Sequence, residues 1–274
     1  MEQKVIVFTD LDGTLLDYYT YSYEYSREGI KLLGEHDIPL IFCTSKSYAE
    51  VLYFRGKTGN TSPFIVENGG AVYIPGDHFK QTEQFKQFAR HDGYIAVELG
   101  ADYKSIRAVF EQMKKEFNNK ITGFGDMSTE EVAQYLNLEP ELAAMAKIRR
   151  HDEPFILKDV TLLDRVRQFS EQHGLKVYPG TRFYHLMGNT DKGVAVKALV
   201  SIYKKVYGNI TTAGIGEGKN DEPMFKEVDL PCVVRKPDGT YADVSVAGIM
   251  KIDAVGPKGF TLAVKQLLKI KHSV

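Results

Sequence analysis

The chain has 274 residues, with 35 lysines and arginines against 36 aspartates and glutamates, and a formal net charge of −1. This balance gives no support for a nucleic-acid or membrane-surface partner, and no stretch approaches the ~20 apolar residues that a membrane span needs. A hydrophobic content of 43% is ordinary for a globular protein, and the length allows one large or two modest domains.

The cysteines and the N-terminal residues indicate the compartment. Cys43 and Cys232 both lie in apolar runs, which is typical of buried free thiols in a reducing compartment rather than of a disulfide or a metal site. Residues 1–4 lead directly into an apolar run and show no signal-peptide pattern. We therefore expect a cytoplasmic protein, while the oligomeric state stays open.

The first apolar run, Val5 to Phe8, leads into two acids set two apart, Asp10 and Asp12, and then Gly13. This pattern predicts a buried parallel strand followed by a loop, and open α/β sheets bind ligands at the carboxyl ends of such strands. Two close carboxylates repel each other, so their burial requires protons or a cation. Mg²⁺ prefers oxygen ligands and is the natural cation; an acidic turn after a strand is the alternative.

A second buried strand is predicted at residues 38–43, after an amphipathic helix near residues 25–35. The strand ends in Thr44-Ser45-Lys46-Ser47, where hydroxyls and free N–H groups at a strand-to-helix junction can bind a phosphate. A plain helix cap is the alternative interpretation of these hydroxyls.

A third strand, at residues 63–66, ends in Glu67-Asn68-Gly69-Gly70. The apolar residues 71–75 then predict a return strand, so the glycines indicate a hairpin turn. Glu67 and Asn68 are either polar groups near a substrate or simply parts of a tight turn.

The pattern changes near residue 80, and from there helices and short strands alternate without a parallel repeat. This order is typical of an α+β unit with an antiparallel sheet. The expected strands are at 95–99, 154–157, 175–178 and 182–186, and the expected helices at 102–117, from 128, at 139–148 and at 162–173. We place this second domain at residues 84–188, inserted between the two halves of the first domain, at 1–83 and 189–274.

Parallel-sheet character returns with Asn189-Thr190-Asp191-Lys192-Gly193, which opens a helix that ends before Gly208. A lysine at a helix start is unfavourable for the helix dipole. Lys192 therefore indicates a nearby anion, with a solvent-facing lysine as the alternative. A strand at 210–215 follows, and its loop carries two further acids, Glu217 and Asp221.

Taken in order, these motifs resemble those of the haloacid dehalogenase (HAD) superfamily of phosphotransferases. The resemblance implies a Rossmann-like parallel α/β core with an inserted α+β cap domain. It also implies that Asp10 is the nucleophile that becomes an aspartyl-phosphate, and that Asp12 is the general acid and then the base. Thr44 would bind a phosphoryl oxygen, and Lys192 would bridge the nucleophile and the phosphate.

The same resemblance implies a Mg²⁺ cofactor held by Asp10, Asp12, Glu217 and Asp221. Relatives usually carry Asp at the place of Glu217, and one extra methylene moves the carboxylate by roughly 1.5 Å, which the tight octahedron of Mg²⁺ would feel. Either the backbone compensates, or Glu217 binds through water while Asp221 is a direct ligand.

The whole chain is most similar to the mannosyl-3-phosphoglycerate phosphatases. The similarity is carried by Thr44-Ser45-Lys46, Glu67-Asn68-Gly69, Val97-Glu98-Leu99-Gly100, Gly180-Thr181-Arg182-Phe183-Tyr184 and Gly188-Asn189-Thr190-Asp191-Lys192-Gly193. Membership implies release of phosphate from 2-O-mannosyl-3-phosphoglycerate to give mannosylglycerate. The alternatives are another sugar-phosphate phosphatase, acting on glucosyl-3-phosphoglycerate or sucrose phosphate, and a phosphosugar-binding protein whose catalysis is impaired.

Such a substrate carries a carboxylate besides its phosphate, and a bidentate cation is the natural partner for it. Arg182 and the pair Arg149-Arg150 are candidates, and Lys46 lies close in sequence to Thr44. A solvated helix terminus is the alternative for Arg149 and Arg150, and a structural role is favoured for His185. The expected substrate-binding residues are Ser45, Lys46, Glu67, Asn68, Arg149, Arg182, Asn189 and Asn220.

Overall fold

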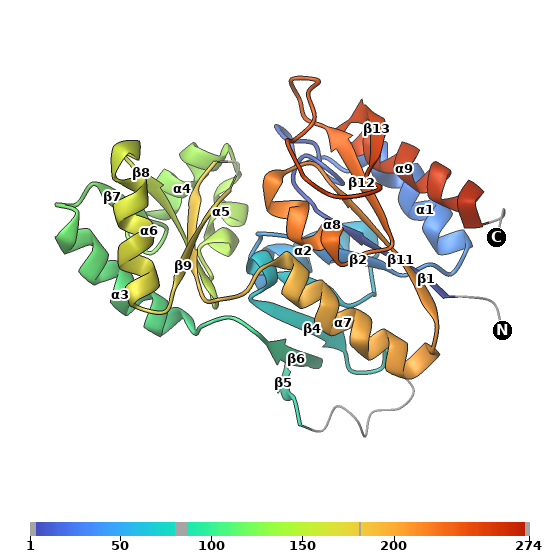
Figure 1. The fold of residues 1–274 in the computed structure, drawn as a ribbon, viewed down its shortest axis with the longest axis horizontal. Helices are drawn as coiled ribbons and strands as arrows, with labels where there is room; N and C mark the ends of the chain where they lie inside the picture. Colours follow the sequence, from blue (N-terminus) through green and yellow to red (C-terminus); the bar gives the residue numbers. More distant parts are fainter. Residues whose placement is uncertain (1–3, 80–86, 181, 272–274) are drawn as a thin grey trace.

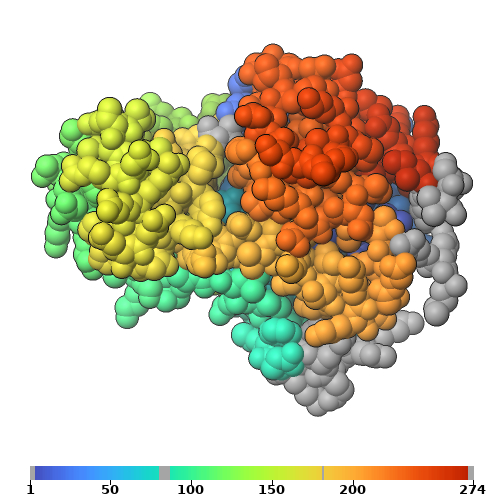
Figure 2. Space-filling model, in the orientation of Figure 1, coloured from blue at the N-terminus to red at the C-terminus, as the bar shows by residue number. Residues whose placement is uncertain are grey.

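The structure, a computed structural model, describes residues 4–79, 87–180 and 182–271. Its strands form two sheets, one of nine strands and one of four. In Figure 1 the four-stranded part lies on the left and the nine-stranded part on the right, and Figure 2 shows the two parts in contact along one side of each. None of the described helices is long and apolar enough to cross a membrane.

The larger sheet has the strand order β13-β12-β11-β1-β2-β3-β4-β6-β5. Its strands are β1 (Lys4–Thr9), β2 (Leu40–Cys43), β3 (Phe64–Val66), β4 (Ala71–Pro75), β5 (Ala89–His91), β6 (Tyr94–Glu98), β11 (Ile210–Gly216), β12 (Leu230–Arg235) and β13 (Met250–Val255). All pairings from β13 to β3 are parallel, and those of β4, β5 and β6 are antiparallel. The expected parallel core and the hairpin between β3 and β4 are therefore confirmed.

Helices cover both faces of this sheet, because its central strands are apolar on both sides. In β1, Val7 faces one core cluster while Ile6 and Phe8 face the other. The first cluster lies under α1 (Arg27–Glu35), α2 (Tyr48–Thr58) and α9 (Gly256–Lys271), and the second lies under α7 (Lys192–Tyr207) and α8 (Glu222–Lys226).

The smaller sheet has the order β7-β8-β10-β9 and is antiparallel throughout. Its strands are β7 (Ile121–Gly123), β8 (Asp152–Leu157), β9 (Lys176–Pro179) and β10 (Tyr184–Met187), and its helices are α3 (Tyr103–Glu116), α4 (Thr129–Leu136), α5 (Pro140–Ala146) and α6 (Leu163–Gln172). Residues of α3 and α6 share a core cluster with this sheet. This part is the α+β unit expected from the sequence, and we call it the cap.

The strand pairing shows that residues expected in the cap belong to the larger sheet. The boundary at 83/84 falls outside the described residues, but β5 and β6 pair with β4 and extend the larger sheet. The prediction that the strand near residue 95 belongs to the antiparallel cap sheet is therefore wrong. Short strands at a sheet edge carry no sequence mark of their partner, because tertiary pairing decides it. We propose that the cap begins after Glu98.

The turn between β3 and β4 is the anchor of the connections to the cap. The carbonyl of Gly70 accepts hydrogen bonds from the backbone N–H groups of Leu99 and Gly100, at 2.9 and 2.8 Å. The hydroxyl of Thr190 donates to the carbonyl of Gly69 at 3.0 Å. Gly69 has a φ of +95°, and a Cβ there would collide with the backbone of the returning connection. The outgoing and returning segments therefore meet at one turn.

Glu67 completes this anchor from inside the turn. It is fully buried, and its Oε2 accepts hydrogen bonds from the backbone N–H groups of Arg150 and His151, at 3.0 and 2.7 Å. Burial raises the pKa of Glu67 to about 7, although Arg149 and the two amides act in the opposite direction. The carboxyl group holds the cap segment just before β8.

This raised pKa makes stability depend on pH. A carboxyl group that binds its proton more tightly in the folded chain contributes stability below its unfolded pKa, and that contribution is lost as pH rises through the folded value near 7. Between pH 5 and 7 we expect the free energy of unfolding of the wild type to fall relative to Glu67→Gln, by up to about 1.4 kcal/mol per pH unit. Urea unfolding at several pH values measures this difference, and a constant difference from pH 5 to 8 would contradict it.

Candidate active site

The carboxyl ends of the parallel strands bring the expected catalytic residues to one edge of the sheet. Asp10 follows β1 directly, and its backbone N–H donates to the carbonyl of Ile215 on β11 at 2.9 Å. Thr44 follows β2, and its hydroxyl accepts from the N–H of Lys46 at 3.2 Å. Glu217 follows β11. Residues far apart in the sequence therefore meet, as the parallel pattern predicted.

Lys192 is the central cation of this edge. It stands at the first position of α7 and is 1% exposed. Its Nζ donates to Asp10 Oδ1 at 2.7 Å and to Asp221 Oδ1 at 2.6 Å. Burial alone would lower the pKa of Lys192, but the two carboxylates raise it above its usual value. The alternative of a solvent-facing lysine is therefore wrong, and the anion inferred from its position is a pair of aspartates.

Four carboxylates are close enough to affect each other at this edge. Burial raises the pKa of Asp10 to about 7, and Asp221 and Asp12 add to the effect while Lys192 opposes it. Burial likewise raises the pKa of Glu217 to about 8, with further contributions from Asp10, Asp221 and Asp12. The lysine does not neutralise the whole cluster, so these acids would be stabilised by further positive charge.

The loop after β11 is folded around Asp221. Its Oδ2 accepts hydrogen bonds from the backbone N–H groups of Glu217 and Gly218, at 3.0 and 2.9 Å. The side chain of Glu217 packs against Gly13, where a Cβ would lie only 2.6 Å from the Glu217 carboxyl carbon. Gly13 also has a φ of +71°. The glycine thus leaves room for the longer acid at position 217.

Two observations bear on whether these residues could hold a metal ion. As the side chains stand, the described part of the chain contains no group of three His, Cys, Asp or Glu arranged to hold a metal ion. However, Glu217 Oε2 is buried without a hydrogen-bond partner among the described residues, and all four acids supply the hard oxygen donors that Mg²⁺ prefers. The oxygen donors and the unpaired Glu217 Oε2 therefore fit Mg²⁺. In this structure Asp10 and Asp221 contact Lys192, and Asp12 contacts Lys46.

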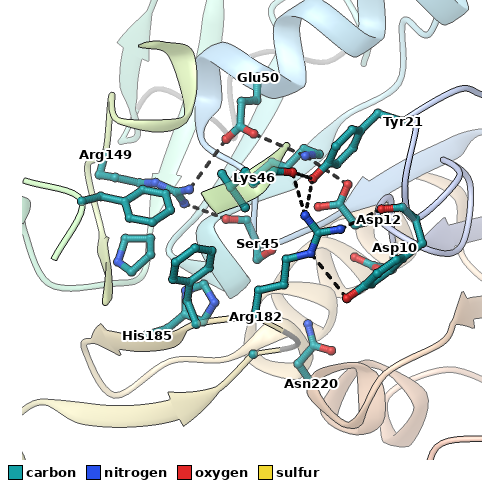
Figure 3. Close-up of a pocket in the computed structure, with 16 residues that line it drawn as sticks. Asp10, Asp12, Tyr21, Ser45, Lys46, Glu50, Arg149, Arg182, His185 and Asn220 are labelled. Carbon is teal, nitrogen blue, oxygen red and sulfur yellow. Dashed lines mark hydrogen bonds and ion pairs between the residues drawn. The ribbon is translucent and has the colours of Figure 1, made fainter. Parts of the chain in front are cut away.

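A cavity of about 80 Å³ opens beside Asp10 and Asp12 and extends between the core and the cap (Figure 3). Core loops and cap strands both contribute to its wall. The lining residues are Asp10, Asp12, Tyr18, Tyr21, Ser45, Lys46, Glu50, Phe124, Leu136, Arg149, Pro154, Gly180, Arg182, Phe183, His185 and Asn220.

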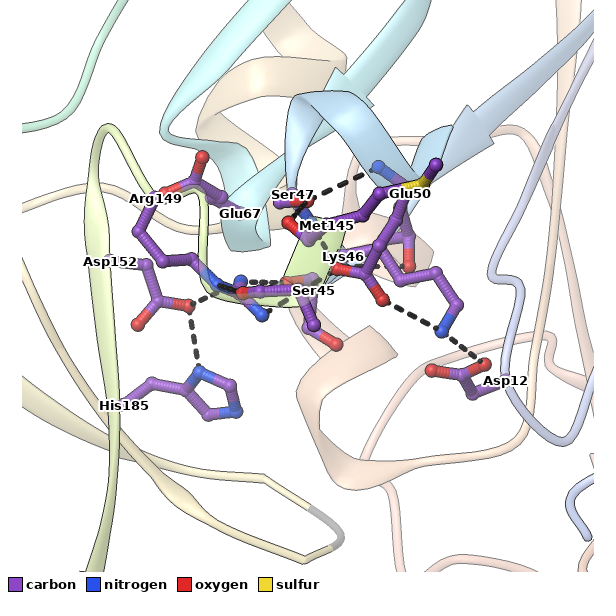
Figure 4. A network of polar contacts seen from close by, with 12 residues as sticks. Asp12, Ser45, Lys46, Ser47, Glu50, Glu67, Met145, Arg149, Asp152 and His185 are labelled. Carbon is purple, nitrogen blue, oxygen red and sulfur yellow. Dashed lines mark hydrogen bonds and ion pairs between the residues drawn. The ribbon is translucent and has the colours of Figure 1, made fainter. Parts of the chain in front are cut away.

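Charged side chains from the core and the cap form a network along this cavity (Figure 4). Lys46 Nζ lies 3.0 Å from Asp12 Oδ1 and 3.3 Å from Glu50 Oε1. Burial would lower the pKa of Lys46, but Asp12 and Glu50 raise it above its usual value. Arg149 Nη1 donates to the carbonyl of Ser45 at 2.7 Å, and its Nη2 lies 3.7 Å from Glu50 Oε2. The alternative of a solvated helix terminus is therefore wrong for Arg149.

Arg182 reaches from the β9–β10 hairpin of the cap to a core loop. Its guanidinium donates to the carbonyl of Tyr18 at 2.8 Å, to the hydroxyl of Tyr21 at 3.0 Å and to the carbonyl of Leu136 at 2.7 Å. It also lies over the Tyr18 ring, 4.5 Å from the centroid, a cation–π contact that adds to the hydrogen bonds. Arg182 therefore connects the two domains at the rim of the cavity.

Only some of the remaining expected residues line this cavity. Asn220 lines the cavity, whereas Asn68 lines a neighbouring one together with Lys192. Asn189 is exposed, and Glu67 is bound to the cap connection instead of lining the cavity. Thr181, part of the hairpin motif, lies outside the described residues.

Sequence reasoning missed Glu50 and Asp152. The Ser47-x-x-Glu50 spacing signals a capping box, and both of its hydrogen bonds are present at the start of α2. That signal could have located Glu50 beside the phosphate loop. Asp152 opens β8 directly after His151, and no local pattern marks its partner His185 on β10.

Comparison with known proteins identifies the class. The family described as haloacid dehalogenase-like hydrolase matches residues 7–238, so the chain belongs to that family. The predicted superfamily and fold class are confirmed.

Curated relatives match over most of their length. The chain is 42% identical to a glucosyl-3-phosphoglycerate/mannosyl-3-phosphoglycerate phosphatase of Methanococcoides burtonii, over 99% of this chain and 100% of that protein. It is 37% identical to a protein of the same name from Persephonella marina, over 96% and 97%. A mannosyl-3-phosphoglycerate phosphatase of Pyrococcus furiosus is 33% identical over 84% of this chain and 90% of that protein.

Solved structures agree with the fold. The sucrose-phosphatase of Synechocystis has a TM-score of 0.63 at 13% identity, covering 99% of each chain. A phosphatase of the HAD superfamily from Bacteroides thetaiotaomicron has a TM-score of 0.66 at 16% identity, covering 100% of this chain and 97% of that one. At these identities the likeness extends to the fold alone.

The Lys192 bridge generates a stability prediction. In Lys192→Met, Asp10 and Asp221 are left buried without their shared cation, and we expect the free energy of unfolding to fall by about 3–5 kcal/mol. Urea unfolding at neutral pH measures the loss. The double variant Lys192→Met/Asp221→Asn removes one of the two stranded charges, so it should recover part of the stability. A loss below about 1 kcal/mol in the single variant would contradict the bridging role.

Proposed function

We propose that this protein is a Mg²⁺-dependent phosphatase that hydrolyses mannosyl-3-phosphoglycerate to mannosylglycerate and phosphate. The observation that carries the proposal is the cluster of Asp10, Asp12 and Lys192. Asp10 and Asp12 line the cavity between core and cap, and Lys192 donates a hydrogen bond to Asp10. The names of the curated relatives supply the substrate class.

The proposed chemistry divides one displacement into two. A carboxylate oxygen of Asp10 attacks phosphorus, the bond from phosphorus to the glycerate oxygen breaks, and Asp12 gives that oxygen its proton. Asp12 then takes a proton from the water that attacks the aspartyl-phosphate, which releases inorganic phosphate and regenerates Asp10. Lys192 lowers the pKa of Asp10 against the effect of burial, so it favours the ionised nucleophile.

Asp10, Asp12, Glu217 and Asp221 would hold the Mg²⁺ ion. When bound, the ion supplies positive charge that offsets the repulsion between an anionic nucleophile and an anionic phosphate. The unpaired Glu217 Oε2 supports this assignment, as does the raised pKa of Asp10 and of Glu217. Thr44, at the end of β2, is the proposed ligand of a phosphoryl oxygen.

The cations at the cavity wall would recognise the substrate carboxylate. Lys46 lies against Asp12, and Arg182 lines the same cavity as Asp10 and Asp12. Arg149 is already bound to the Ser45 carbonyl and lies near the carboxylates of Glu50 and Asp152. We therefore assign the carboxylate to Lys46 and Arg182 first.

Glucosyl-3-phosphoglycerate is the second candidate substrate, because the names of two relatives include both sugars. The impaired-catalysis alternative is disfavoured, since a binding protein needs no Asp10–Lys192 pair beside a second acid. We also propose a cytoplasmic location, which the two buried free thiols, Cys43 and Cys232, support.

Catalysis is tested with p-nitrophenyl phosphate as a generic ester and with the two glycosyl-3-phosphoglycerates. We expect turnover that needs Mg²⁺ and stops on chelation with EDTA. Asp10→Asn should reduce kcat by more than about 10³-fold because the amide is not a nucleophile, and Asp12→Asn should nearly abolish turnover. If wild type shows no turnover above Asp10→Asn yet still binds sugar phosphates, the enzyme proposal fails.

Carboxylate recognition is tested by Arg182→Ala. The variant loses the guanidinium that faces the substrate carboxylate, so we expect KM for glycosyl-3-phosphoglycerate to rise about 10-fold or more. KM for p-nitrophenyl phosphate should change much less. Arg182→Lys keeps the charge and serves as the matched control. Equal increases for both substrates in Arg182→Ala would assign Arg182 to cap closure instead.

A further inference from the structure

A histidine–aspartate pair lies on the cap side of the cavity. His185 Nδ1 is 2.7 Å from Asp152 Oδ2, across the neighbouring strands β10 and β8. Asp152 is fully buried and His185 is 8% exposed. Because a carboxylate only accepts hydrogen bonds, the pairing places a hydrogen on Nδ1 and fixes the ring orientation. The reaction proposed above assigns no role to this pair.

The second ring nitrogen of His185 is directed away from Asp152 (Figure 4). Nε2 has no hydrogen-bond partner within the described ranges, and His185 lines both the catalytic cavity and the neighbouring cavity that contains Lys192. A Cβ at Gly180 would lie 2.6 Å from Nε2. The glycine in the hairpin therefore leaves this edge of the ring open, whereas any larger residue would press on it.

Apart from His185 and the arginines Arg149 and Arg182, the cap residues that line the cavity are apolar. Phe124 and Phe183 pack edge to face with centroids 4.8 Å apart, and both line the cavity together with Pro154. Aromatic faces beside a few fixed polar groups are the composition of a small-molecule pocket. Here the fixed polar group on the cap sheet is His185, because Asp152 and the strand pairing hold it in place.

We propose that the cap side of the cavity is a sugar subsite, in which His185 hydrogen-bonds a hydroxyl of the glycosyl group. This inference rests on the proposed glycosyl-3-phosphoglycerate substrate. Nε2 can accept from a hydroxyl or donate to it, since a hydroxyl serves in both ways. Asp152 is the positioning residue, and Arg149 Nη1, 3.8 Å from the same carboxylate oxygen, balances its charge.

The alternative is that the His185–Asp152 pair only stabilises the cap sheet and does not contact the substrate. The variant His185→Asn distinguishes this structural role from substrate binding. The amide nitrogen of asparagine takes the place of Nδ1 and can keep the bond to Asp152, while no atom replaces Nε2. We therefore expect the variant to keep its cap fold and to lose only the sugar contact. Thermal unfolding of both proteins checks the fold.

The decisive measurement is kcat/KM for two substrates, glycosyl-3-phosphoglycerate and the sugar-free p-nitrophenyl phosphate. In His185→Asn we expect a fall of about 10- to 100-fold for the glycoside, the range for a lost hydrogen bond to a substrate hydroxyl, and a change below about 3-fold for the sugar-free ester. The matched control is His173→Asn, at an exposed cap position, which should change neither.

The outcomes separate this inference from the proposed function. If wild type cleaves the sugar-free ester but neither glycoside, the proposed substrate fails and the sugar subsite fails with it. Suppose instead that wild type cleaves the glycosides, and that His185→Asn lowers kcat/KM equally for the glycoside and the sugar-free ester, or for neither. The proposed function then stands, and the sugar contact of His185 is overturned.

Discussion

One buried cation holds the catalytic edge together. Lys192 connects Asp10, directly after β1, with Asp221 in the loop after β11, and all three side chains are nearly or fully buried. Buried charges are tolerated only when they are paired, and this contact ties the start of α7 to the loops that follow β1 and β11. Glu217 lies outside this pairing: its Oε2 is buried without a partner among the described residues, and a divalent cation there would favour its ionised form.

A second constraint links the edge to the cap. The turn after β3 binds the outgoing segment through Gly70 and the segment before β8 through Glu67, while Arg182 bonds to a core loop on the opposite side of the cavity. The cap is therefore held at a turn of the core sheet and at a guanidinium near the cavity rim. Of the Arg182 contacts, those with Tyr18 and Tyr21 cross from the cap to the core, whereas the bond to the Leu136 carbonyl stays within the cap.

The sequence predicted the parts of this arrangement that local patterns encode. Continuous apolar runs marked β1 and β2, because strands buried on both faces need no polar alternation. The acids after β1 follow the rule for ligand sites in parallel sheets. The lysine at a helix start was interpretable because its position is electrostatically unfavourable without an anion. Each of these signals lies within about ten residues of the chain.

What the sequence could not give depends on partners far along the chain. The carboxyl group of Glu67 binds an amide 84 residues away, and Asp152 binds an imidazole 33 residues away on another strand. Neither residue has a periodic or capping pattern that names its partner, and β5 and β6 likewise joined the core sheet through tertiary pairing. The cap wall is thus the least predictable part of the site. Asp152 and His185 are positioned by the register between β8 and β10, which local motifs do not encode.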